Sequence, residues 1–427
     1  MNILFVHQSF PGQYRHLAPA LAARGHQVAA LTMGAKPAAQ PGVNVVRYTV
    51  RRGNAPGMHP WAAEFETKVL RGESAAFASL KLGTEGFKPD VICAHPGWGE
   101  ALFLKDVWPD ARLLTYCEFY YRAYGADMNF DPEFATPGTG ADARIRAKNA
   151  GNLLSLEATD WGISPTHWQR SLFPEWAQSR ISVIHDGIDT SLARPDPRAR
   201  LQLEEFGLDL RHGDEVVTFV NRNLEPQRGC HVFMRALPEL LRRRPKAQVL
   251  IVGGDKQGYG APPPAGRTWK EVFLDEVRAD IDLARVHFLG TVPYPVFLRL
   301  LQVSAAHVYL TYPFVLSWSA LEAMSSGCLV IGSRTGPVEE VIDDGRNGLL
   351  VDFFDPQALA CTIADALADP GACLPLRERA RADALAKYDL HGVCLPRQVA
   401  LVEALAEQVP PALPVAAPFQ TPGVTTC

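Results

Sequence analysis

The sequence lacks the features that mark several large protein classes. Its 427 residues carry a formal net charge of −4, so there is no basic surplus with which to bind a nucleic-acid backbone. The eight cysteines form no C-x-x-C pair, which favours small buried side chains in a reducing cytoplasm. There is no run of about 18 apolar residues to span a membrane, and the opening Met1-Asn-Ile-Leu-Phe-Val-His lacks the basic region of a signal peptide. We therefore expect a soluble cytoplasmic protein with no nucleic-acid partner.

Two common site motifs are also missing. No G-x-G-x-x-G follows the first predicted strand, which argues against a nicotinamide-dependent oxidoreductase. No Asp-x-Asp ends a predicted strand, where a carboxylate pair would hold a metal ion. Asp280-Ile-Asp282 has the spacing, but it precedes a strand and its surroundings are typical of a helix. We therefore expect no metal site.

What the sequence does contain is an alternation of strands and helices in both halves. Apolar residues make up 47% of the chain, enough for sizeable cores. The first half predicts strands at 3–6, 27–31, 90–94, 113–116, 161–163 and 181–184, with a helix at 14–23. The second half predicts strands at 215–220, 248–252, 286–289 and 306–310, with helices at 230–243 and 294–303. This pattern predicts an α/β fold of two Rossmann-like, doubly wound parallel-sheet domains that face each other across a cleft.

The boundary between the domains is expected at about 186–213. Asp186-Gly-Ile-Asp189 is typical of a turn, and Pro195-Asp-Pro197 is typical of a linker. We assign residues 1–190 to an N-terminal acceptor domain and residues 210–390 to a C-terminal donor domain. Alanine- and leucine-rich helices are expected at 357–369 and 376–407, and 391–409 is a candidate for crossing back to the N-terminal domain. The tail at 410–427 is rich in proline and threonine and is predicted to be disordered.

Residues 311–340 form the most informative segment. They predict the end of a strand, a loop, a short helix, a buried strand, a glycine turn and the start of a second helix. Two helix N-termini would then lie close together at the carboxyl edge of a parallel sheet. Unpaired backbone N–H groups and the positive ends of two helix dipoles suit a diphosphate group.

Three short motifs carry a family resemblance. The loop at 221–229 is Asn-Arg222-Asn-Leu-Glu-Pro-Gln-Arg228-Gly, residues 321–324 are Leu-Glu322-Ala-Met, and 336–340 are Gly-Pro-Val-Glu-Glu. They resemble the G-R-x-x-x-x-K-G, L-E-A-M and G-G-x-P-E segments of family 4 (group 1) glycosyltransferases, retaining enzymes of the GT-B fold. The resemblance runs from residue 1 to about 405. It departs from the family in having arginine at position 228, where lysine is usual, and in one extra residue between the two cations.

The resemblance implies roles for three of these side chains. Arg222 and Arg228 would be catalytic, clamping the donor diphosphate and neutralising the leaving group. Glu322 would accept hydrogen bonds from the two ribose hydroxyls. The same residues also allow plainer roles: two solvated arginines paired with Glu225, and a helix capping box between Ser319 and Glu322.

One family position is changed. The family places a glutamate that contacts the donor sugar eight residues before Glu322, and this chain has Phe314 there. The backbone N–H groups of Val315, Leu316 and Ser317 remain candidates for donor binding. Ser317 is equally a candidate helix cap.

Further candidates come from loops that the resemblance places at the cleft. Gly12 would let the backbone approach the donor, although a plain turn also suits a glycine. His95, at a strand end, is a candidate catalytic residue near the donor sugar, or a packing histidine. Glu118 follows another strand and is a weaker candidate. Gly336 would bind the donor through its loop.

The sequence therefore predicts a metal-independent, retaining hexosyltransferase that needs no cofactor. It would move a hexose from a UDP- or GDP-sugar to an acceptor hydroxyl, in polysaccharide or glycolipid biosynthesis. The acceptor would be a carbohydrate or a lipid-linked molecule, with peripheral contact at the inner face of the membrane as one location. The loops Arg51–Trp61 and Tyr120–Arg146 are candidates for shaping its pocket. A nucleotide-sugar 2-epimerase would need further cleft carboxylates, and a catalytically impaired nucleotide-sugar-binding or partner-binding protein is the alternative that Phe314 raises.

Overall fold

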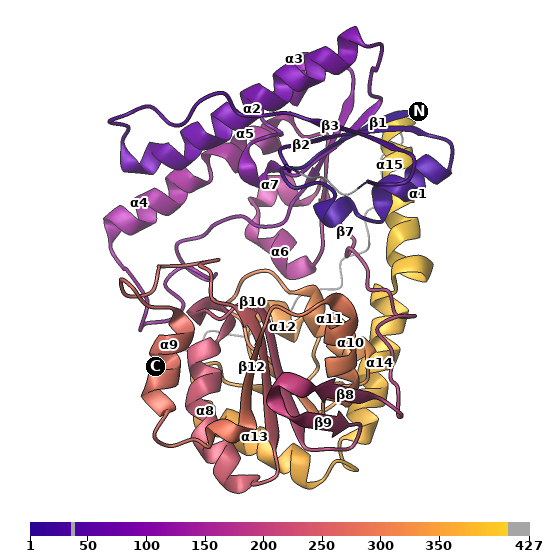
Figure 1. The fold of residues 1–427 in the computed structure, drawn as a ribbon. Helices are drawn as coiled ribbons and strands as arrows, with labels where there is room; N and C mark the ends of the chain where they lie inside the picture. The colour runs from indigo at the N-terminus through magenta and orange to yellow at the C-terminus, as the bar shows by residue number, and fades with distance from the viewer. Residues whose placement is uncertain (36–38, 409–427) are drawn as a thin grey trace.

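The structure, a computed structural model, describes residues 1–35 and 39–408 and contains two parallel sheets, one in each half of the chain (Figure 1). The first sheet has seven strands in the order β3-β2-β1-β4-β5-β6-β7. Its strands are β1 (Asn2–Val6), β2 (Gln27–Thr32), β3 (Val43–Arg47), β4 (Val91–Ala94), β5 (Arg112–Tyr116), β6 (Trp161–Ser164) and β7 (Ile181–Val183). The edge strand β3 was not predicted, and the tail predicted to be disordered, 410–427, lies outside the described residues.

Helices cover both faces of the first sheet. They are α1 (Leu17–Ala23), α2 (Pro60–Thr84), α3 (Leu104–Val107), α4 (Thr139–Lys148), α5 (Ala150–Ala158), α6 (His167–Leu172), α7 (Glu175–Gln178) and, from the end of the chain, α15 (Leu395–Ala406). In β1, Ile3 and Phe5 pack into one cluster with α1 and α15, whereas Leu4 and Val6 pack into another with α2 and α3. Successive side chains point to opposite faces of a strand, so a strand buried on both faces must be apolar throughout.

The second sheet has six strands in the order β12-β11-β10-β13-β14-β15. They are β10 (Val216–Asn223), β11 (Gln248–Gly254), β12 (Val286–Gly290), β13 (Ala306–Tyr309), β14 (Leu329–Ser333) and β15 (Leu349–Val351). Its helices are α8 (Cys230–Arg243), α9 (Trp269–Val277), α10 (Tyr294–Val303), α11 (Trp318–Ser325), α12 (Gly336–Glu339), α13 (Pro356–Ala368) and α14 (Leu374–Tyr388). The two predicted doubly wound parallel-sheet domains are confirmed.

Two segments differ from their sequence-based predictions. The stretch predicted as the domain boundary, 186–213, contains an antiparallel hairpin, β8 (Arg200–Leu203) and β9 (Leu208–Arg211), whose Leu201 and Leu210 are buried in the second domain. The single helix predicted at 376–407 is two helices, α14 and α15, separated by a π-helical turn at Leu390–Cys394. In Figure 1 these yellow helices run along the side of both domains, and α15 packs on α1, β4 and β5.

A loop of the first domain crosses the cleft and packs on the second. It follows β5, and its Asp131 accepts hydrogen bonds from the hydroxyl of Tyr312 (2.8 Å) and lies 2.9 Å from Nε2 of His231. Glu133 forms a bidentate ion pair with Arg235 of α8. Asp131, Glu133 and His231 are close enough together to resemble a metal site, but their oxygen and nitrogen atoms are used in these contacts between the domains.

Candidate active site

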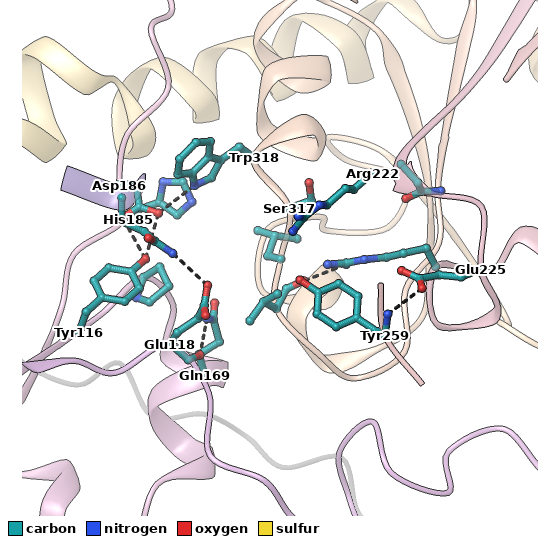
Figure 2. Close-up of a pocket in the computed structure, with 16 residues that line it drawn as sticks. Tyr116, Glu118, Gln169, His185, Asp186, Arg222, Glu225, Tyr259, Ser317 and Trp318 are labelled. Atoms are coloured by element: carbon teal, nitrogen blue, oxygen red, sulfur yellow. Dashed lines mark hydrogen bonds between the residues drawn. The ribbon is translucent and has the colours of Figure 1, made fainter. Parts of the chain in front are cut away.

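One pocket lies between the two domains, at the carboxyl ends of β5 and β10 (Figure 2). The first domain contributes Gln13, Tyr116, Glu118, Gln169 and Asp186 to its wall. The second contributes Arg222, Glu225, Arg228, Tyr259 and residues 315–318. Ligands of open α/β sheets bind outside the carboxyl ends of the strands, so the pocket lies where this fold places a ligand.

Arg222 and Arg228 both reach this pocket, as the two-cation motif predicts, but they are held differently. Arg228 is buried, and its Nη1 donates to Thr311 Oγ1 (2.9 Å) and to the carbonyl of Val315 (3.0 Å). Its guanidinium also lies 5.6 Å from the ring centre of Phe314 and 5.9 Å from that of Tyr259. Arg222 is exposed, and among the described residues no carboxylate pairs with it. Its charge is therefore available to a ligand.

Glu225 does not neutralise the two arginines by a direct ion pair. Its buried carboxylate accepts hydrogen bonds from the backbone N–H groups of Gly258 (3.1 Å) and Tyr259 (2.7 Å). Burial raises the pKa of Glu225, although these two bonds oppose the rise. The carboxylate therefore anchors the loop after β11, which carries Tyr259 to the pocket wall.

The loop before α11 supplies backbone donors, but fewer than the sequence suggested. The N–H of Ser317 donates to the hydroxyl of Tyr309 (2.7 Å), and the Ser317 side chain caps the helix by accepting from the N–H of Ser319. The N–H groups of Val315 and Leu316 donate to no acceptor in the described part of the chain. Val315, Leu316 and the start of α11 thus line the pocket beside the arginines.

Phe314 is part of an aromatic contact between the domains. Its ring is 4.6 Å from that of Phe119 in the first domain and 4.8 Å from that of Tyr259 in the second. Trp168 and Leu172 of α6 complete the same buried cluster. At this position the chain therefore uses apolar packing across the cleft instead of a carboxylate.

Glu322 lies one turn along α11 from Trp318, which lines the pocket. Its carboxylate accepts a hydrogen bond from the hydroxyl of Tyr294 (2.8 Å), and burial raises its pKa. The capping-box interpretation is wrong, because Ser317 and not Ser319 is the N-cap and Glu322 does not bond back to it. Glu322 is not among the residues that line the pocket, and ribose binding by it stays a prediction.

His95 lies behind the pocket wall rather than on it. It is 2% exposed and stacked between Trp98 and Tyr116, with ring centres 4.5 and 5.3 Å away. Its Nδ1 accepts the N–H of Gly97, so the ring proton is on Nε2, which lies 3.2 Å from Glu118 Oε2. Glu118, the weaker candidate from the sequence, is the side chain that reaches the pocket.

The two candidate glycines are explained by close packing. Gly12 has a φ of +48°, and a Cβ there would lie 2.4 Å from the His7 ring; its neighbour Gln13 reaches the pocket. At Gly336, a Cβ would lie 2.2 Å from the indole nitrogen of Trp168. The second predicted helix tip, at α12, therefore packs against α6 of the first domain. There Glu340 accepts hydrogen bonds from the backbone N–H groups of His167 (2.8 Å) and Trp168 (2.7 Å).

Several pocket residues were not singled out in the sequence. Asp186, interpreted as part of a hinge turn, accepts hydrogen bonds from Tyr116 (2.9 Å) and from the indole of Trp318 (2.8 Å), and burial raises its pKa to about 6. Gln13 and Tyr259 stand in loops with no recognisable motif. The available signal for Gln13 was its position after β1. Because β1 pairs with β4 and β4 pairs with β5, the segments that follow these three strands lie side by side.

Two parallel-sheet domains that face each other across a pocket define the GT-B class of fold. Comparison with family models adds the family: one described as "Glycosyl transferase family 4 group" matches residues 24–193, and one described as "Glycosyl transferases group 1" matches residues 214–369. The chain belongs to the family 4 (group 1) glycosyltransferases, retaining enzymes of the GT-B fold. No described helix is both long enough and apolar enough to cross a membrane.

Individual proteins are similar to parts or to the whole of the chain. A GDP-mannose-dependent alpha-(1-6)-phosphatidylinositol monomannoside mannosyltransferase of Mycolicibacterium smegmatis is 32% identical over 189 residues, 43% of this chain and 46% of that protein. The match thus spans less than half of that relative. The glycogen synthase of Mycobacterium tuberculosis is 26% identical over 97% of this chain and 98% of its own. The structure of Anabaena HepE in complex with UDP and glucose has a TM-score of 0.64 at 19% identity, covering 95% of this chain and 99% of that one.

Proposed function

We propose that this protein transfers a hexose from a UDP- or GDP-sugar to an acceptor hydroxyl, with retention at the anomeric carbon, in polysaccharide or glycolipid biosynthesis. The observation that carries the proposal is that Arg222, Arg228, Val315 and Leu316 line one pocket, and that the N–H groups of the last two donate to no acceptor among the described residues. Cations and backbone donors at a helix start favour a diphosphate.

The same groups suit the chemical step. When the bond from the sugar to the phosphate oxygen breaks, negative charge grows on the diphosphate. The guanidinium of Arg228 stabilises that charge with little reorganisation, because the structure already holds it in place, and the exposed Arg222 adds a second positive charge. Arg228 is held by Thr311 and by the Val315 carbonyl, so it also fixes the loop that carries the backbone donors. We propose that these groups replace a metal ion.

The named relatives support a hexose as the transferred sugar, but they do not decide between UDP and GDP as the nucleotide of the donor. The mycobacterial mannosyltransferase is described as GDP-mannose-dependent, and the HepE structure contains UDP and glucose. A glycogen synthase and a phosphatidylinositol mannoside enzyme also differ in acceptor, one a polysaccharide and the other a glycolipid. The proposal therefore commits to hexose transfer and keeps the two donor classes.

A donor panel tests this function. UDP, GDP, UDP-glucose and GDP-mannose are added to the purified protein in the presence of EDTA. Thermal stability and release of nucleoside diphosphate from the two sugar nucleotides are then measured. We expect one nucleotide to raise the melting temperature and its sugar nucleotide to be turned over despite the chelator. Failure of every compound to bind contradicts the proposal, and turnover only with added divalent metal contradicts metal independence.

A second function is favoured by one observation. Phe314 closes part of the cleft by packing against Phe119, where the family has a sugar-contacting carboxylate. A catalytically impaired nucleotide-sugar-binding or partner-binding protein would show that substitution. Tight nucleotide binding without any turnover in the donor panel would select this alternative.

A further inference from the structure

The pocket contains three carboxylates from different loops, and two of them are occupied. Glu225 accepts two backbone N–H groups from the loop at 258–259, and Asp186 accepts hydrogen bonds from Tyr116 and Trp318. Glu118 differs from both because, among the described residues, its carboxylate contacts only Gln13 and His95, which belong to the first-domain side of the pocket. Its side chain is 34% exposed, and it lies on the first-domain wall, opposite Arg222 in Figure 2.

Two buried histidines at neighbouring strand ends determine the orientation of Glu118. His7 follows β1, and its Nδ1 accepts the N–H of Ser9, so its proton is on Nε2, which donates to Gln13 Oε1 (2.9 Å). Gln13 in turn donates from Nε2 to Glu118 Oε1 (3.1 Å). The Nε2 of His95 lies 3.2 Å from Glu118 Oε2.

The surroundings of this carboxylate keep it charged. Burial alone raises the pKa of Glu118, but the contact with His95, helped by His7 and Gln13, outweighs burial and lowers it. The charged or titratable groups around it are His7, His95, Asp186, the hydroxyls of Tyr14, Tyr116, Tyr121 and Tyr259 and, across the pocket, the two arginines. At neutral pH the pocket therefore presents Glu118 as an anion, beside the hydrogen-bonded Asp186, on the wall opposite its cations.

We infer that Glu118 is the residue that faces the anomeric carbon of the donor sugar, with His95 and Gln13 as its positioning residues. This rests on the proposed transferase function. If the arginines bind the diphosphate, the sugar extends from them toward the opposite wall. The bond from C1 to the phosphate oxygen breaks, and its electron pair goes to the phosphate. An acceptor or water oxygen adds to C1, and its proton passes to the departing phosphate.

Glu118 forms no bond in this step. Its negative charge stabilises the positive charge that grows at C1 while the leaving group departs, and its oxygens accept hydrogen bonds from sugar hydroxyls. A preorganised charge of this kind acts on the transition state more than on the bound donor. Glu118 is then a group from the first domain that the reaction needs only after the cleft has closed, which makes catalysis depend on closure.

The test compares Glu118→Gln with Glu157→Gln, an exposed glutamate on α5 of the same domain. UDP-glucose and GDP-mannose are the probes, and release of nucleoside diphosphate into water is measured, so that no acceptor is required. We expect Glu118→Gln to lower kcat by about 100-fold or more. Its affinity for UDP or GDP should stay within about threefold, because the nucleotide is held by the other domain. The control variant should match the wild type.

Each result has a distinct meaning. Wild-type kcat in Glu118→Gln overturns the inference and leaves the proposed transferase function standing. A wild-type protein that binds no nucleotide, or that binds without turnover, overturns both together. An equal loss of nucleotide affinity and kcat in Glu118→Gln also overturns it, since that pattern indicates a damaged fold or a ground-state contact.

The positioning role of His95 has its own measurement. In His95→Gln the contact that lowers the pKa of Glu118 is lost while burial remains. The acidic limb of the kcat/KM profile should therefore move to higher pH. A lower rate with an unmoved limb would show that His95 only packs between Trp98 and Tyr116, and would overturn its positioning role.

Discussion

The two arginines of the pocket make different predictions because the structure holds them differently. Arg222 is exposed and makes no ion pair within the described residues, so Arg222→Ala should change the free energy of unfolding by less than about 0.5 kcal/mol. Removing one fixed donor from a developing charge costs about 2 to 4 kcal/mol. At about 1.4 kcal/mol for each factor of ten, kcat/KM should fall by roughly 30-fold to 1000-fold.

Arg228→Ala should lose activity and stability together. Its Nη1 donates to Thr311 Oγ1 and to the Val315 carbonyl, and the substitution leaves those acceptors without this donor. An unsatisfied buried polar group costs about 1 to 3 kcal/mol, so we expect a loss of that size in the free energy of unfolding. Arg228→Lys should recover part of the charge but not the bonds to both acceptors, because lysine is a point charge and not a planar fork.

The assay for both variants is nucleoside diphosphate release from UDP-glucose and GDP-mannose, beside denaturant unfolding. Arg198→Ala is the matched control, since Arg198 is exposed and lies in the connection between the domains, away from the pocket. If Arg222→Ala and Arg228→Ala both keep wild-type kinetics, the two cations do not clamp a leaving group and the site is wrongly assigned. If only Arg228→Ala loses activity, and its loss is explained by the lower free energy of unfolding, the role of Arg228 is to hold the loop at residue 315.

Three other predictions test neighbouring parts of the structure. Glu322→Gln should weaken the binding of UDP or GDP measured by calorimetry. It should leave the free energy of unfolding nearly unchanged, because Glu322 bonds to Tyr294 and does not cap α11. A loss of stability without a loss of nucleotide affinity would contradict ribose binding. Glu340→Ala should cost about 1 kcal/mol, because it removes the acceptor of two N–H groups in the first turn of α6, and it should expand the protein in small-angle scattering. Exposed Glu339→Ala should do neither, and equal behaviour of the two variants would refute this contact between the domains. Burial lowers the pKa of His307 to about 4, so the unfolded chain takes up its proton first and stability is lost as pH falls from 6.5 toward 4. Between pH 7 and 5 the wild type should therefore lose about 2 kcal/mol more than His307→Phe in denaturant unfolding, and parallel losses would show that this ring does not titrate as inferred.

The strands of the first sheet's centre could be predicted because burial on both faces demands uninterrupted apolar runs, as in Ile3 to Val6. The edge strand β3 could not, since its side chains are only partly buried and its apolar pattern is broken by Asn44. The long helix α2 contains Gly72 and Gly83, which oppose helix formation. Glycine is needed at these two positions because the Gly99 carbonyl and the Trp108 ring approach the helix closely. No pattern in the local sequence indicates these contacts.

The residues of the site also fall into two groups, those that a local motif indicates and those that only the fold brings together. Arg222 and Arg228 stand in one loop with a recognisable spacing, so a local motif brings them to the pocket. Glu118, His95 and Gln13 come from three loops, and only the order of β1, β4 and β5 in the sheet makes them neighbours. Sequence could place each of them at a strand end, but it could not show that Glu118 stands in front of His95.

Phe314 connects the departure from the family motif to closure of the cleft. Its ring packs against Phe119 and Tyr259, and the same ring lies beneath the guanidinium of Arg228. Opening the cleft would expose these aromatic faces, and burying one such side chain is worth about 1.5 to 3 kcal/mol. The closed arrangement is thus stabilised by apolar contacts at the position where a carboxylate would repel them. Glu118 is the residue next to Phe119, so the chain links the carboxylate on the first-domain wall directly to this aromatic contact between the domains.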